Sequence, residues 1–202
     1  MLIKLFFTAT SFFLAVSCTA QENVSDSIVR WADKGKITWQ EFTVKDTNER
    51  FAAESLTFFK ANFFLKDDSV FCQVITYLNK NQSWRKPTIS ENDDYGINHE
   101  QMHFNITELF AREVRKSIID HDLNEQQVKK IYMENAKACR AFQELYDSET
   151  RHSLDREKQA FWNSKIERLL SNLEAFKEQF IFIKNPWCKP CWKDQPMIAA
   201  SF

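Results

Sequence analysis

The chain lacks an excess of charge of either sign. It contains 27 Lys and Arg residues against 28 Asp and Glu residues, which gives a net charge of -1. Binding to nucleic acid or to an anionic surface requires a basic patch or a basic run, and the sequence contains no long run of one sign. The composition therefore argues against a nucleic-acid partner.

The sequence also lacks an apolar run long enough to span a bilayer. Its longest early run, Leu5–Val16, is shorter than the roughly 20 residues that a membrane-spanning helix needs. This run follows a single lysine and precedes small residues, as in a secretory signal, which we assign to residues 1–20. Two processing outcomes are compatible with it. Ala15–Cys18 resembles a lipobox that makes Cys18 the lipidated first residue, which we favour, whereas cleavage after Ala20 gives a freely secreted chain. Either outcome predicts an exported protein of the periplasm or cell envelope, with membrane contact only through such a lipid anchor.

Few cysteines remain once Cys18 is lipidated or removed. The four others are Cys72, Cys139, Cys188 and Cys191. Four cysteines can pair in three ways, and an exported protein permits disulfides. We predict Cys72 with Cys139 and Cys188 with Cys191, while free buried thiols remain the alternative for the first two.

The C-terminal segment Trp187–Cys191 resembles the Trp-Cys-x-Pro-Cys redox motif of thioredoxin-like proteins. Such a motif lies early in a βαβ unit, but here only Trp192–Phe202 follow it. Three of the four prolines also fall between residues 185 and 202, where they oppose a continuing helix. We therefore interpret residues 185–202 as a tail without redox function.

Residues 21–184 form one predicted domain. Alternation of apolar and polar residues predicts strands at 37–43, 53–66 and 70–78, with a turn at 67–69 and a polar loop at 79–94. Helical spacing follows from residue 97 to 119, and two further helices begin near Asn124 and Ser153 and continue toward the end of the chain. Strands first and helices afterwards predict an α+β fold with an antiparallel sheet beside a helical hairpin.

Histidine is scarce, and its placement is informative. Two of the four histidines are His99 and His103, with Glu100 directly after the first. In a helix, residues i and i+4 lie on one face, so both imidazoles can bind one Zn²⁺ while the carboxylate stays free as a general base. The motif predicts a zinc hydrolase of the HExxH type with Glu100 as its catalytic residue.

A catalytic zinc usually takes three protein ligands. His121 would lie about 27 Å beyond His103 along a continuous helix, and Glu108 faces away from His99 and His103. We assign Glu108 instead to an ion pair with Arg112. His152 is the one remaining imidazole, and a helical hairpin could return it to the site. The other candidate ligands are Asp147 and Glu149, and Asp147 could instead orient a ligand histidine.

Two sequence blocks together resemble a family of exported bacterial proteins of unknown function that are regarded as predicted zinc-dependent proteases. The matching segments are Ile37–Trp39 with Phe42, Ala52–Ser55, Ser83–Trp84, Asn98–Phe104, Ile106–Arg112, Tyr146–His152 and Gln159–Trp162. The resemblance implies a zincin-like fold, a zinc cofactor, a peptide or protein substrate, His99 and His103 as ligands, Glu100 as catalytic residue and His152 as third ligand.

The chain departs from that family at two positions. Ser153 stands where the family often has glycine, and Met102 stands where it often has a small residue. We expect neither to abolish the site, because the methionine side chain adapts its shape easily. The expected function is zinc-dependent peptide hydrolysis. The alternative is a non-catalytic envelope lipoprotein or binding protein with a structural or vestigial zinc site, and the oligomeric state stays open.

Overall fold

A long antiparallel hairpin forms the centre of the main sheet. In the computed structural model, which describes residues 27–66, 69–120 and 125–183, β4 (Thr57–Lys66) pairs with β5 (Ser69–Asn79) along its whole length. The other edge of β5 pairs with β1 (Ile28–Arg30) and with β7 (Phe180–Ile183), both antiparallel. In the described part of the chain, the outer edge of β4 therefore pairs with no strand.

The sequence predicted this hairpin but neither of the short strands beside it. β1 lies in a stretch that reads as a polar leader, and β7 lies where the chain was expected to remain helical. Strands of three or four residues carry too little alternation to be detected, and their pairing with β5 decides their conformation.

A small second sheet flanks the start of the hairpin. It consists of β2 (Thr43–Val44), β6 (Trp84–Arg85) and β3 (Ala53–Glu54), in the order β2-β6-β3. The strand predicted at 37–43 is wrong for most of its length, because Trp39–Glu41 form a 3-10 helix. Thr38 and Glu41 cap this turn reciprocally, and that local signal overrides the imperfect alternation.

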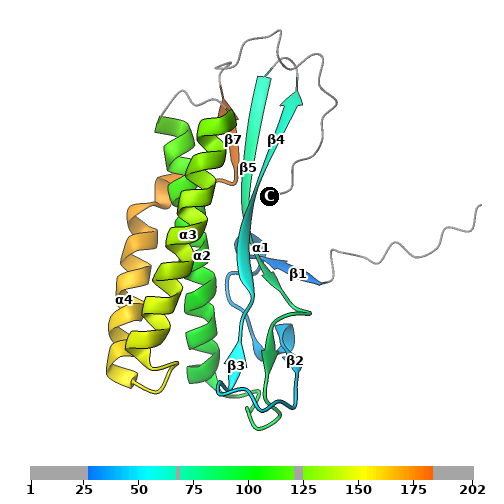
Figure 1. Ribbon diagram of the computed structural model, residues 1–202, viewed down its shortest axis with the longest axis vertical. Coiled ribbons are helices and arrows are strands. Elements are labelled where there is room, and N and C mark those ends of the chain that lie inside the picture. Colours follow the sequence, from blue (N-terminus) through cyan, green and yellow to red (C-terminus); the bar gives the residue numbers. More distant parts are fainter. Residues whose placement is uncertain (1–26, 67–68, 121–124, 184–202) are drawn as a thin grey trace, which may run out of the picture.

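Three long helices cover one face of the main sheet. α2 (Asp94–Asp120) packs directly on β4 and β5, and α3 (Glu125–Thr150) and α4 (Arg156–Asn172) form a hairpin that packs against α2 (Figure 1). α3 also reaches β4, where Tyr132 contacts Phe59. The single-turn helix α1 (Trp31–Lys34) contacts β5, and a 3-10 turn (Glu174–Phe176) leads to β7. The molecule is thus α+β, with α2 as its central layer. No described helix is long and apolar enough to cross a membrane.

The middle of α2 carries a buried charge cluster. The predicted ion pair is confirmed, with Arg112 Nε 3.0 Å from Glu108 Oε1, but both side chains are buried and Arg115 Nη1 also lies 2.8 Å from this oxygen. Thr76 donates a hydrogen bond to Glu108 Oε2, and Arg115 donates to the carbonyl of Val74. The cluster therefore fixes α2 against β5, and removal of one partner would leave a buried charge uncompensated.

Cys72 and Cys139 are both buried free thiols, so their predicted disulfide is wrong and the alternative holds. They lie in the apolar core, where burial raises the pKa of Cys72 to about 12. Cys18, Cys188 and Cys191, the signal segment 1–20 and the tail 185–202 lie outside the described residues.

Candidate metal site

The helix α2 presents His99 and His103 on one face, as the HExxH spacing predicts. Their ring centres lie 5.0 Å apart, and both side chains are buried. Glu100 is buried beside them at 4 % exposure. The helical expectation for this segment is confirmed, because 27 residues of α2 are continuous through the motif.

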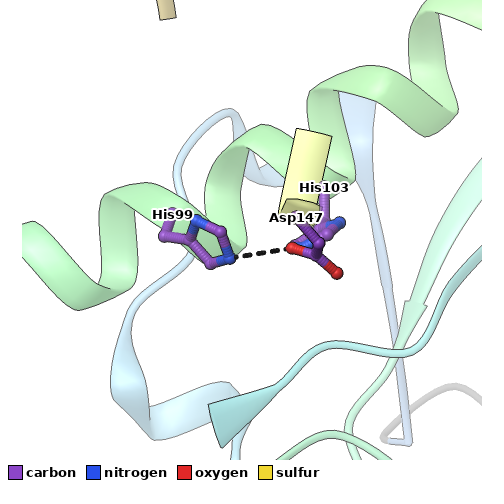
Figure 2. A group of neighbouring side chains, drawn as sticks. All are labelled: His99, His103 and Asp147. Carbon is purple, nitrogen blue, oxygen red and sulfur yellow. Dashed lines mark ion pairs between the residues drawn. The ribbon is translucent and has the colours of Figure 1, made fainter. Parts of the chain in front are cut away.

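Asp147 brings a carboxylate from α3 to these two imidazoles. Its Oδ1 lies 3.2 Å from His99 Nε2 and 3.0 Å from His103 Nε2 (Figure 2). The candidate ligand atoms of the three residues all lie within 4.8 Å of one another. This set of two histidines and one aspartate could hold a metal ion.

Two glutamine side chains orient the imidazoles. Gln159 Oε1 lies 2.9 Å from His99 Nδ1, and Gln143 Oε1 lies 2.9 Å from His103 Nδ1. The amide nitrogens have other acceptors: Gln159 donates to the Tyr146 hydroxyl and Gln143 donates to Thr107 Oγ1. Because a carbonyl oxygen only accepts, each histidine donates its Nδ1–H to a glutamine, which leaves Nε2 of the neutral ring free to bind a metal.

Three electron-pair donors thus converge on one point, which favours a positive charge there. Burial lowers the pKa of His103, but hydrogen bonding to Asp147 and the charges of Asp147 and Glu100 raise it above its ordinary value overall. Burial raises the pKa of Asp147, but the two histidines hold it well below its ordinary value. A metal dication would supply this positive charge without a proton.

His152 lies next to this group rather than within it. Its Nδ1 is 3.6 Å from Asp147 Oδ2, the oxygen that does not face the other two histidines, and its ring centre lies 4.1 Å from that of Phe51 with the two planes tilted by 40°. The structure therefore places Asp147, the alternative ligand, where the sequence favoured His152. Glu149 is directed elsewhere, since its Oε2 accepts a hydrogen bond from Trp162 Nε1.

The turn after α3 explains this arrangement. Asp147 lies within the last turns of α3, whereas Arg151, His152 and Ser153 have positive φ angles of 52°, 51° and 68°. This left-handed run ends the helix and carries His152 outward, and α4 begins after Asp155 caps its N-terminus. Glycine would adopt the φ of Ser153 without strain, so the serine backbone is strained at this position.

Met102, where the sequence departs from the resembling pattern, packs into the core beside the site. Met102 is 3 % exposed and belongs to the apolar core, and its sulfur lies 3.9 Å from Asn105 Nδ2. Sequence reasoning missed Gln143 and Gln159 as the groups that orient the histidines. Their signal was available, because Gln143 precedes Asp147 by one helical turn and Gln159 begins the last matching segment.

A cleft of about 510 Å³ opens onto the histidines, Glu100 and Asp147. Glu100 Oε2 is buried and receives no hydrogen bond from the described residues. Residues 51–59, which include β3 and the start of β4, line one side of the cleft, and α3 lines the other. The site therefore combines three residues that could hold a metal ion, an unpaired carboxylate oxygen and room for a ligand.

Comparisons of the chain with family models, with curated proteins and with solved structures find no match.

Proposed function

We propose that the protein is an exported zinc-dependent metallopeptidase with a zincin-like fold. The observation that carries this proposal is the convergence of His99 Nε2, His103 Nε2 and Asp147 Oδ1 beside the unpaired Glu100 Oε2 at the edge of a cleft. Catalytic zinc sites use three protein ligands of these types and keep a fourth position for water, whereas structural sites are closed by four protein ligands.

Zinc suits this ligand set, and when bound it would polarise a substrate carbonyl and make a bound water more acidic. Glu100 would accept the proton of that water with its unpaired oxygen and deliver it to the leaving amine. Gln143 and Gln159 would hold the two imidazoles in the tautomer that binds metal.

The cleft edge supplies a means of holding an extended peptide. The N–H of Leu56 donates a hydrogen bond to Ser83 Oγ, and its carbonyl accepts one from the N–H of Asn79. Both backbone groups of Leu56 therefore face the sheet. Because backbone groups alternate in direction along a strand, Ser55 and Thr57 direct theirs away from the sheet, at the edge that lines the cleft. A peptide could add to this edge as a further strand.

The test is peptide cleavage by zinc-refilled protein, read by mass spectrometry on a mixture of synthetic peptides. Glu100→Gln should retain zinc and folding but lose roughly 10²–10⁴-fold in cleavage rate, which is the usual contribution of a general base. Glu113→Gln, on the same helix but outside the cleft lining, is the matched control and should cleave normally. Wild-type cleavage by zinc-loaded Glu100→Gln would contradict the proposed role.

A further inference from the structure

The cleft is elongated, and one of its ends is closed. Its lining residues from α3 run from Asp147 at the metal site to Tyr132, about four helical turns earlier. On the opposite side, the lining runs along residues 51–59. The helix α2 contributes Gly96, His99, Glu100, His103 and Thr107, and so forms the floor between the two sides.

Tyr132 closes this groove by contacting β4. Its hydroxyl donates a 2.9 Å hydrogen bond to the carbonyl of Phe59, and the two rings pack edge to face with centroids 5.2 Å apart. Both side chains are buried, at 9 % and 5 % exposure. Among the described residues of β4, the lining ends at Phe59. The carbonyl of Phe59, which is the next outward-facing one after Thr57, already accepts the hydrogen bond from Tyr132 and cannot pair with an added strand.

The metal site lies a short distance from this closed end. The Thr57 and Thr107 hydroxyl oxygens are 2.6 Å apart, and Thr107 Oγ1 donates to the carbonyl of His103 one turn earlier. His103 and His99 precede Thr107 by about 6 and 12 Å along α2, at 1.5 Å per residue. At about 3.3 Å per residue along a strand, these distances correspond to two to four residues before Thr57. The two histidines of the candidate site therefore lie opposite residues 53–55. Four or five extended residues then separate this point from Phe59.

The interior of this segment suits a peptide of apolar character. Phe59, Tyr132, Ala136 and Cys139 form its walls near the closed end. Ser55 lines the groove with a buried hydroxyl oxygen that has no hydrogen-bond partner in the described part of the chain. A peptide backbone beside residues 53–57 could satisfy this hydroxyl and the outward backbone groups of the edge.

We propose that the groove accepts peptides with a free chain end no more than four or five residues from the bond at the metal site, and that apolar side chains are preferred toward that end. The protein is then specific for short peptides or chain ends, and it excludes internal segments of long chains. This inference rests on the proposed peptidase function.

The probes are synthetic peptides that carry a hydroxamate, a group that binds zinc. One series has the hydroxamate at the C-terminal end and the other has it at the N-terminal end, each with one to seven alanine or leucine residues. Binding to zinc-refilled protein is measured by calorimetry. In the series whose peptide extends toward the closed end, affinity should increase up to the fourth or fifth residue and then fall at least 10-fold with the next residue. Near that limit, the leucine peptides should bind more tightly than the alanine peptides.

Filling the groove should shorten it. Ala136 lies one helical turn from Tyr132 within the lining, so Ala136→Trp should move the limit about two residues toward the metal site. Ala138→Trp, on an exposed position of the same helix outside the lining, is the matched control and should leave the limit unchanged.

The outcomes separate the two proposals. If hydroxamates bind but neither series shows a limit through seven residues, or if Ala136→Trp does not move it, the closed groove is wrong and the peptidase proposal stands. If no hydroxamate binds to protein that holds zinc, the peptidase proposal itself fails.

Discussion

Substitution of Asp147 should weaken zinc binding far more than substitution of His152. Asp147 Oδ1 lies 3.0–3.2 Å from both Nε2 atoms, so Asp147→Asn removes one of three candidate ligands together with its charge. Groups that only orient a ligand contribute about 10–100-fold in metal affinity. The loss for Asp147→Asn should therefore exceed 100-fold, or about 2.7 kcal/mol. His152, at 3.6 Å from Asp147 Oδ2 and 40 % exposed, should cost less than about 10-fold when changed to alanine.

The assay is competition for zinc with a chelator of known affinity at fixed pH. Gln143→Ala should fall between the two variants, because Gln143 holds the tautomer of His103 without facing the metal position. Asp46→Asn, at an exposed position outside the cleft lining, controls for the loss of a carboxylate. A larger loss of affinity in His152→Ala than in Asp147→Asn would refute the assignment of Asp147 as the third ligand.

Three further predictions concern stability and pH. Glu108→Ala leaves buried Arg115 without a carboxylate partner and buried Arg112 with only that of Glu174, and it should lower the free energy of unfolding by about 3–5 kcal/mol in urea titrations. A loss below about 1 kcal/mol would contradict the role given to the cluster. Ser153→Gly should raise that free energy by about 1 kcal/mol, because glycine adopts a φ of 68° without strain; a decrease would show that the serine side chain stabilises the turn. Burial lowers the pKa of His103, but Asp147 and Glu100 raise it above the ordinary histidine value of 6.5 overall. Zinc must therefore displace a proton from His103, and the affinity for zinc should increase as the pH rises beyond 6.5. A zinc affinity that is constant above that pH would contradict this coupling.

The HExxH helix and the β4–β5 hairpin could be predicted from sequence because their signals are local. His99 and His103 are one helical turn apart wherever the helix forms, and the hairpin alternates over twenty residues. The antiparallel pairing and the α+β class follow from the same patterns.

The third candidate ligand was harder to predict, because its position depends on tertiary geometry. Asp147 and His152 are five residues apart, and which of them faces α2 depends on where α3 ends. Three consecutive positive φ angles at Arg151–Ser153 decide this, and none of these residues is a glycine that would have marked the turn. The orienting amides were missed for the same reason, since Gln143 and Gln159 come from two helices whose relative position the sequence does not specify.

The most direct test of the central claim is the amount of zinc per chain, measured by elemental analysis on purified protein before and after refilling with zinc, beside the His99→Ala/His103→Ala double variant. We expect close to one zinc per chain in the parent protein and a clear loss in the variant. A parent protein that holds no zinc even after refilling would contradict this expectation.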